Sequence, residues 1–155
     1  MRTTLLAVTL LASSAAFAED TCTIEAGPRD VVQRSGDVTI EAGRDVETVY
    51  ALDGGVRLEK GAKVKSIVAF HGDVTVAEGA EVTNDIIALD GFVKVAKGAT
   101  VKSTVELSKR GLRVQGDDHD DVAINVSVGG KSLAQCIGEE AVKKVKDCRI
   151  VAKKD

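Results

Sequence analysis

Aliphatic residues recur at every sixth position along most of this chain. Three such steps form a longer repeat of 18 or 19 residues, in which the short segments beginning at Gly36, Gly55, Gly72 and Gly91 correspond to one another. Self-similarity at this period is typical of solenoids, in which each repeat forms one coil that stacks on the next. The chain is therefore expected to be all-β, a single three-sided parallel β-helix of about five coils.

Alignment of the repeats assigns the inward side chains to three faces, with two inward residues in each short strand. The first face is Val38/Ile40, Val56/Leu58, Val74/Val76, Val93/Val95 and Leu112/Val114. The second face is Val46, Ala62/Val64, Ala80/Val82 and Ala99/Val101. The third face is Tyr50/Leu52, Val68/Phe70, Ile87/Leu89 and Val105/Leu107. Outward columns such as Asp45, Lys63 and Glu81 alternate in charge, which supports this register because stacked like charges repel. The one extra residue falls around Thr83-Asn84-Asp85.

The regular coils are predicted over residues 36–130, with a cap at each end, because an open solenoid end exposes unpaired strand edges and apolar core. Residues 19–35 are expected to form the N-terminal cap and residues 131–155 the C-terminal cap. Within the latter, the stretch from Ser132 to Val151 has the apolar spacing and charge order of a short helix.

Residues 1–18 have the composition of a signal peptide. Arg2 supplies a positive charge, Leu5 to Ala12 is largely apolar, and Ala16-Phe17-Ala18 has the small-x-small pattern that a signal peptidase cuts. Cleavage near Ala18 predicts a periplasmic or extracellular protein. The apolar stretch is shorter than the roughly 20 residues that a membrane-spanning helix needs, so no transmembrane segment is expected in the mature chain.

The charge of the chain argues against a nucleic-acid-binding protein. The full sequence has 21 Lys and Arg residues and 24 Asp and Glu residues. Loss of Arg2 with the signal peptide leaves 20 basic residues and a net charge of −4. Nucleic-acid-binding domains usually carry a basic patch or stripe, so no nucleic-acid partner is expected.

Three cysteines in an exported chain predict one disulfide and one further cysteine. Cys136 and Cys148 flank the predicted helix and are nearest in sequence, so a bridge between them would fasten the C-terminal cap. A continuous helix would hold them about 18 Å apart, and the chain would have to turn back at Gly138 or near Asp147. Pairing of Cys22 with either cysteine is the alternative, and it requires the tail to fold back along the coils.

The densest cluster of possible metal ligands is the acidic run Asp117, Asp118, His119, Asp120 and Asp121. Several carboxylates can bind a hard cation such as calcium. The run lacks the ligand spacing of an EF-hand and of the calcium-binding β-roll repeat. We interpret it as a solvated loop that bulges from the fifth coil, and we expect no metal site and no cofactor.

Two other side chains are candidates for specific contacts. Phe92 is predicted to point outward, and an exposed aromatic ring can stack on a sugar, so it is the candidate binding residue. His71 lies at a corner whose equivalent positions hold Asp53 and Asp90, which predicts hydrogen bonds at that corner.

The repeat resembles those of two protein families. Residues 76–82 and 95–101 look like the hexads of the hexapeptide acyltransferases, enzymes that form left-handed β-helices and activate the acyl acceptor with a histidine. Residues 72–82 and 86–101 more closely resemble the bactofilins, polymer-forming cytoskeletal proteins. This second resemblance covers roughly residues 36–114. It implies a β-helix that associates with other copies end to end.

We therefore expect a non-enzymatic, exported structural or scaffold protein of the bacterial cell envelope, which forms homo-oligomers through the ends of its β-helix. The alternative is a module that binds an envelope polysaccharide or protein. An acyltransferase-like enzyme is the least favoured hypothesis, because neither histidine lies beside a substrate loop and acyl-coenzyme A is not expected outside the cytoplasm.

Overall fold

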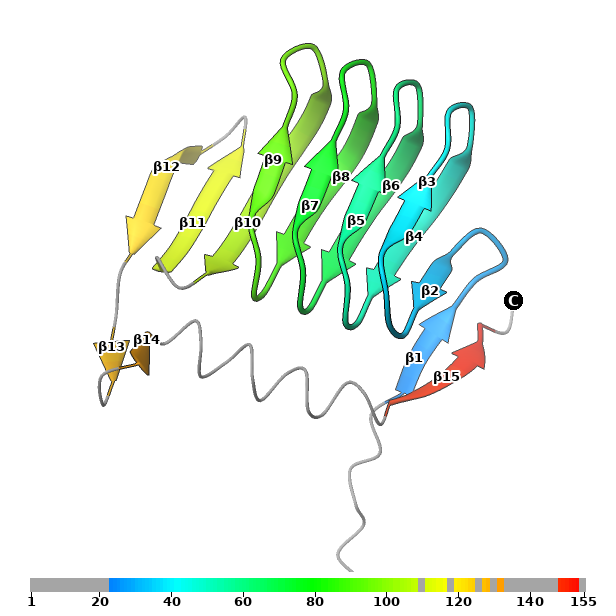
Figure 1. The fold of residues 1–155 in the computed structure, drawn as a ribbon, viewed down its shortest axis with the longest axis horizontal. Helices are drawn as coiled ribbons and strands as arrows, with labels where there is room; N and C mark the ends of the chain where they lie inside the picture. Colours follow the sequence, from blue (N-terminus) through cyan, green and yellow to red (C-terminus); the bar gives the residue numbers. More distant parts are fainter. Residues whose placement is uncertain are drawn as a thin grey trace, which may run out of the picture.

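The repeat folds as a β-solenoid in which short and long strands alternate along the chain (Figure 1). The computed structural model describes residues 23–108, 111–116, 119–124, 127–128, 131–132 and 148–153. These residues form strands, turns and bends and contain no helix. The strands are β1 (Thr23–Ala26), β2 (Val31–Gln33), β3 (Val38–Ile40), β4 (Asp45–Ala51), β5 (Val56–Leu58), β6 (Lys63–Ala69), β7 (Val74–Val76), β8 (Glu81–Ala88), β9 (Val93–Val95), β10 (Thr100–Ser108), β11 (Gly111–Gly116), β12 (His119–Ile124), β13 (Ser127–Val128), β14 (Lys131–Ser132) and β15 (Arg149–Ala152).

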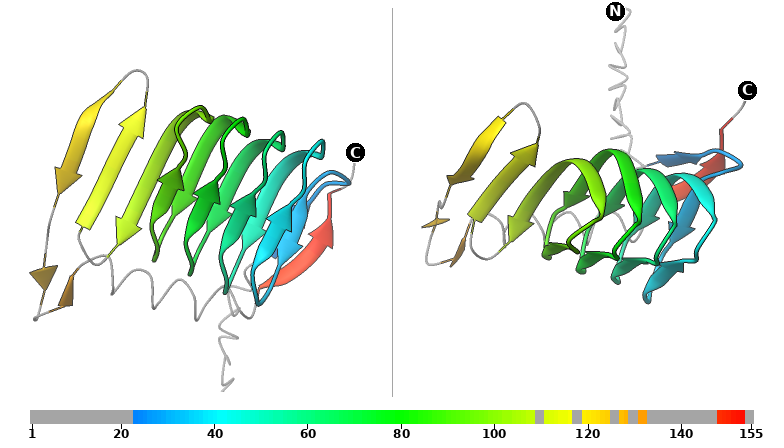
Figure 2. Two further views of the ribbon diagram at one scale, coloured as in Figure 1. Left: turned by 45° about the horizontal axis from the view of Figure 1, so that its top comes forward. Right: turned by 90° about the horizontal axis from the view of Figure 1, so that it is seen from above.

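Two parallel sheets build the coils (Figures 1 and 2). Strands β3, β5, β7 and β9 form a four-stranded sheet, whereas β2, β4, β6, β8 and β10 form the parallel part of a seven-stranded sheet. The four short strands correspond to about four turns of solenoid. The register between β6 and β8 shifts between Val82 and Ile86, which confirms the predicted extra residue at this corner.

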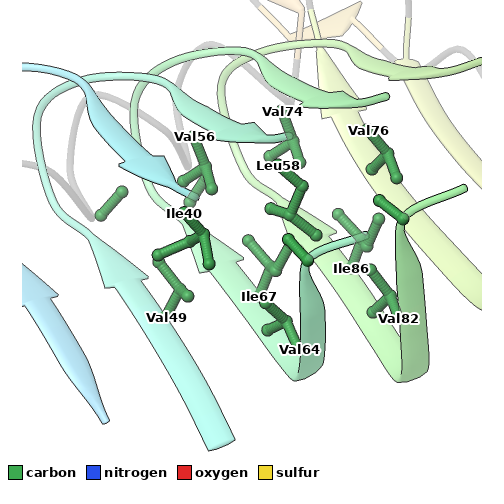
Figure 3. Packing of buried hydrophobic residues seen from close by; sticks show 14 of the residues in the cluster. Ile40, Val49, Val56, Leu58, Val64, Ile67, Val74, Val76, Val82 and Ile86 are labelled. Carbon is green, nitrogen blue, oxygen red and sulfur yellow. The ribbon is translucent and has the colours of Figure 1, made fainter. Parts of the chain in front are cut away.

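The inward residues of the first two predicted faces are confirmed in the central coils (Figure 3). Their relative exposure is 2% or less. Each fully buried valine, leucine or isoleucine side chain among them contributes roughly 1.5–3 kcal/mol to folding. These residues are Ile40, Val46, Val56, Leu58, Ala62, Val64, Val74, Val76, Ala80 and Val82.

The register predicted for the third face is wrong by one residue. In β4 the side chains of Val49 and Ala51 are fully buried, whereas Tyr50 between them is half-buried on the opposite face of the sheet. The same shift holds in the next two coils, where Ile67, Ala69, Ile86 and Ala88 point inward. Both faces of these strands carry apolar residues, so the period of two does not distinguish them.

The placement of Leu112 and Val114 on a fifth parallel coil is also wrong. Strand β11 pairs antiparallel with β10, which sets Val114 opposite Val105, and β12 pairs antiparallel with β11. The prediction that the whole acidic run is a loop is also wrong, because residues 119–121 belong to β12. The parallel stack therefore ends at β10. The three-sided cross-section stays a prediction.

The tail does not remain at the C-terminal end of the solenoid, where the sequence placed it. Strand β15 pairs in parallel with β1, in the register Thr23 to Arg149 through Ala26 to Ala152, and both lie at the N-terminal end (Figure 1). The predicted helix is thus wrong for Ser132, which belongs to β14, and for residues 149–151, whose Arg-Ile-Val sequence suits a strand. Residues 133–147 of that helix, and the signal peptide at residues 1–18, lie outside the described residues.

One corner of the solenoid is formed by stacked glycines. A Cβ atom added to Gly72, whose φ is +145°, would collide with the carbonyl oxygen of Gly54 and lie 2.7 Å from the nitrogen of Gly55. At another corner Gly61 has a φ of +81°, but a Cβ atom there would meet no atom within 4 Å. The first corner therefore needs glycine for space as well as for conformation, and the second for conformation alone.

We predict that Gly72→Ala lowers the free energy of unfolding by about 3 kcal/mol, because the coils must separate locally to admit the methyl group. The matched variant Gly61→Ala should lose only the cost of the left-handed conformation, about 1–2 kcal/mol. Chemical denaturation of the two variants and the wild type measures the difference. Equal losses for the two variants would contradict a close approach of the coils at Gly72.

Candidate functional site

The two ends of the solenoid expose the core to different extents. Ile40 and Val95 occupy the same inward column, at the first and the last short strand respectively. Ile40 is 1% exposed and Val95 is 44% exposed. Among residues 23–108, 111–116 and 148–153, whose side chains the structure describes, Val95 is the one exposed large hydrophobic residue. The C-terminal end of the four-stranded sheet is therefore the open end.

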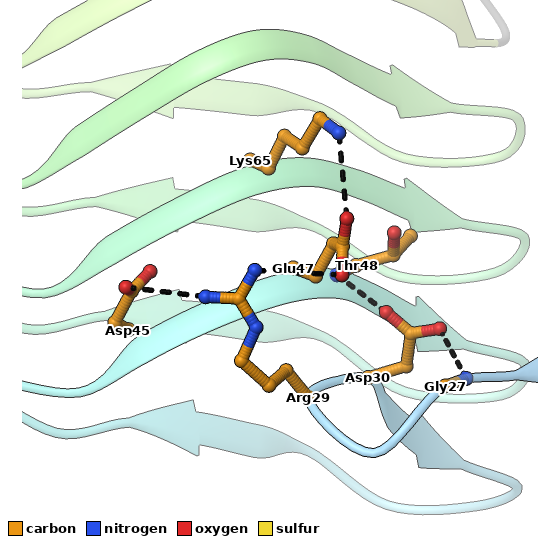
Figure 4. A network of polar contacts seen from close by, with 7 residues as sticks. All are labelled: Gly27, Arg29, Asp30, Asp45, Glu47, Thr48 and Lys65. Carbon is orange, nitrogen blue, oxygen red and sulfur yellow. Dashed lines mark hydrogen bonds and ion pairs between the residues drawn. The ribbon is translucent and has the colours of Figure 1, made fainter. Parts of the chain in front are cut away.

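The N-terminal end is covered by an additional turn of chain that includes β2. Asp30 holds this turn in place, because its two carboxylate oxygens accept hydrogen bonds from the N–H groups of Gly27 at 2.7 Å and Thr48 at 2.9 Å (Figure 4). Arg29 beside it forms an ion pair with Asp45 at 3.5 Å. Val31, the first residue of β2, packs against the main core.

At the open end, strand β10 places polar side chains where earlier coils have aliphatic ones. Thr104 follows Ile86 in one inward column, and Glu106 follows Ala88 in the next. Both are 9% exposed, and Ser108 in the same strand is 2% exposed. The sequence analysis missed these residues because it assigned the other face of the strand to the interior. One feature of the sequence could have indicated the correct face: alanine recurs at positions 51, 69 and 88, and Glu106 takes the equivalent position in the next coil.

A cavity of about 340 Å³ lies between β9, β10 and β11 at this end. Glu106 lines it, and its Oε2 accepts a hydrogen bond from the N–H of Val93 at 3.0 Å. Arg113, which is paired with Glu106 across the strands, lines it too. Phe92 and Lys94 complete the charged and aromatic part of its lining.

The cavity thus combines an aromatic ring with groups of both charges. The backbone N–H of Phe92 donates to Asp73 at 2.9 Å, and the Lys94 ammonium lies 3.6 Å from the same carboxylate group, which positions the β9 end of the site. Such a lining suits the binding of a polar ligand or of an extended chain segment. Phe92, selected from the sequence, is half-buried here and does not stand free on an outer surface.

His71 forms the predicted corner contacts. Its Nδ1 lies 3.0 Å from a carboxylate oxygen of Asp53, and its Nε2 lies 3.6 Å from Asp90. The three residues form one column, each one coil from the next. His71 therefore lies between the two carboxylates and contacts both, which avoids stacking like charges directly on one another. This column explains the choice of residue at the corner without any catalytic role.

The other candidate residues are only partly described. Cys148 is disulfide-bonded and buried in a small cluster with Leu52, Ile24 and Phe70. Cys22 and Cys136 lie outside the described residues, so its partner stays a prediction. Asp117 and Asp118 lie outside them as well, whereas the backbone of His119, Asp120 and Asp121 forms the start of β12. Among the described residues no group of three or more His, Cys, Asp or Glu side chains could hold a metal ion.

We predict that His71→Asp lowers the free energy of unfolding by about 1 kcal/mol, since it stacks three carboxylates in one column. His71→Asn, which adds no charge, serves as the control and should lose less. Thermal unfolding at low and at high salt tests the cause, because about 1 M salt should remove most of the difference between the variants. A difference that is independent of salt would contradict the electrostatic explanation.

Within the described ranges no helix is long and apolar enough to cross a membrane. Comparisons with protein-family models, with curated proteins and with solved structures find no match to this chain. The resemblance to the bactofilins therefore depends on the repeat pattern alone, and it stays a prediction.

Proposed function

We propose that this chain is a non-enzymatic, exported structural or scaffold protein of the bacterial cell envelope, and that it self-associates through the open end of its solenoid. The observation that supports this proposal is the 44% exposure of Val95 at the end of a column that is otherwise buried. An aliphatic side chain at an unpaired strand edge is the kind of surface that another β-strand covers.

The contrast between the two ends gives the proposal its geometry. Strands β3 and β9 are both edges of the four-stranded sheet, but the core is covered at the β3 end, where Ile40 is 1% exposed and Val31 packs against the core, whereas Val95 in β9 is 44% exposed. A second copy that adds a strand to β9 would bury Val95 and satisfy the free edge through main-chain hydrogen bonds. The bactofilin-like repeat over residues 36–114 and the signal-peptide pattern at residues 1–18 support an envelope polymer or scaffold. A three-sided cross-section and a short helix within residues 133–147 belong to the same proposal.

We predict that the mature chain, lacking residues 1–18, associates as its concentration rises and that Val95→Glu abolishes this association, because the change places a charge in the contact. Thr75→Glu is the matched control: it adds the same charge to the outward side of a central short strand and should leave association intact. Sedimentation velocity over a range of concentrations measures all three. A wild-type chain that stays monomeric throughout would refute self-association.

A second candidate function is the binding of an envelope polysaccharide or protein, and the cavity beside Phe92 favours it. The cavity lining also includes Lys94 and Arg113, which can donate hydrogen bonds to hydroxyl or carboxylate groups of a sugar, and Glu106, which can accept them from hydroxyl groups, while the ring packs against the apolar face of the sugar. This site lies at the same end as Val95, so ligand binding and self-association would compete for one surface.

If the cavity binds glycans, Phe92→Ala should weaken binding roughly tenfold in a pull-down with purified envelope polysaccharide. Phe92→Leu keeps apolar volume but removes the ring, and it should lose nearly as much affinity. Arg57→Ala on the outer face of a central strand is the control and should bind like the wild type. Unchanged binding by both Phe92 variants would exclude this cavity as the glycan site.

A further inference from the structure

The disulfide of Cys148 has a partner that the fold can identify. The chain has three cysteines, so the partner is either Cys22 or Cys136. Cys148 directly precedes β15 and is 1% exposed. Its carbonyl oxygen accepts a hydrogen bond from Arg34 at 3.1 Å, which places it against the first coil of the solenoid.

The register between β1 and β15 continues to the two cysteines. Four consecutive pairs, beginning with Thr23 and Arg149, run in parallel without a shift. One further step toward the start of both strands sets residue 22 opposite residue 148. Directly paired residues on neighbouring strands lie about 4.8 Å apart, and a disulfide requires roughly 4.4–6.8 Å between its Cα atoms. We propose that Cys22 and Cys148 form the disulfide, which clamps the returning tail to the start of the solenoid.

Cys136 follows β14 too closely in the sequence to reach Cys148 at the other end of the solenoid. Strand β14 ends at Ser132 and lies at the β12 end of the solenoid, whereas β15 lies at the β1 end (Figures 1 and 2). Six strand-to-strand spacings separate β12 from β2 in the seven-stranded sheet, or about 29 Å. The four residues from Ser132 to Cys136 reach at most about 14 Å when fully extended. They do not span the distance to Cys148.

Formation of the bond is a two-electron oxidation. The two thiols lose two protons and two electrons as the sulfur atoms join, and a disulfide oxidant, such as an exported thiol–disulfide oxidoreductase, is reduced to its dithiol. The product encloses residues 22–148 in one covalent ring, so the starts of β1 and β15 stay tethered even when the rest of the chain unfolds. Cys136 is left as the third, unpaired cysteine of the ring.

A non-reducing peptide map of the mature full chain, oxidised with glutathione disulfide, tests the assignment. Trypsin should release residues 147–149 linked to the N-terminal peptide that ends at Arg29, whereas the peptide 132–143 should carry Cys136 as an alkylated thiol. Linkage of peptide 132–143 to either of the others overturns the proposal. The map uses the wild-type chain, so it does not depend on whether a variant folds.

Two variants provide a second measurement. In Cys136→Ser a reductant should lower the unfolding temperature by about 10 °C, because it opens a ring of more than one hundred residues. In Cys22→Ser the reductant should have no effect, because no bond remains to be reduced. The opposite pattern, with loss of the effect in Cys136→Ser and its retention in Cys22→Ser, also overturns the proposal.

Discussion

Main-chain hydrogen bonds between successive coils are the interaction on which the rest of this structure depends. At one corner the N–H groups of Gly36, Gly54 and Gly72 each donate to a carbonyl group of the next coil, over 2.8, 2.8 and 3.2 Å. Because every coil takes its register from its neighbour, side chains one repeat apart lie within about 5 Å of each other. Stacked positions must then be apolar inside, compatible in charge outside, and glycine where two backbones meet.

Prediction from the sequence succeeded where one side of a strand is apolar and the other polar. Strand β5 reads Val-Arg-Leu and β7 reads Val-Thr-Val, so only one inward set is possible. It failed in β4, β6 and β8, where Val-Tyr-Ala and similar runs offer two apolar sides. The larger side chains were chosen for the interior there, but the structure buries the alanines at positions 51, 69 and 88. A narrow interior has room for small residues in this column, and larger ones would overpack it.

The pairing of β1 with β15 could not be predicted, because no repeat connects two strands that lie more than 120 residues apart in the sequence. The sequence pattern predicted a cap over residues 19–35 and a helix up to Val151, and it carried no information on a strand register between them. The charged columns, in contrast, could be predicted from the sequence. Lys63 and Glu81, at 3.4 Å, and Lys65 and Glu47, at 3.4 Å, form the ion pairs that the alternation implied. Exposed pairs contribute only about 0–1 kcal/mol each, so they disfavour wrong registers more than they stabilise the right one.

The open end is a consequence of how the stack stops. An interior coil has the same neighbours on both sides, so only the first and last coils can present surfaces of their own. Glu106, 9% exposed, interrupts the alanine column, and its carboxylate accepts one hydrogen bond from the N–H of Val93. A further parallel coil on top of it would remove the rest of its contact with solvent, which is costly for a charged group with a single hydrogen bond. The chain instead turns antiparallel into β11, and the four-stranded sheet ends at β9 with Val95 uncovered. Glu106, which disfavours a further coil, also lines the cavity. The same change, from alanine to a charged residue in an inward column, both ends the parallel stack and supplies a polar group to the candidate site.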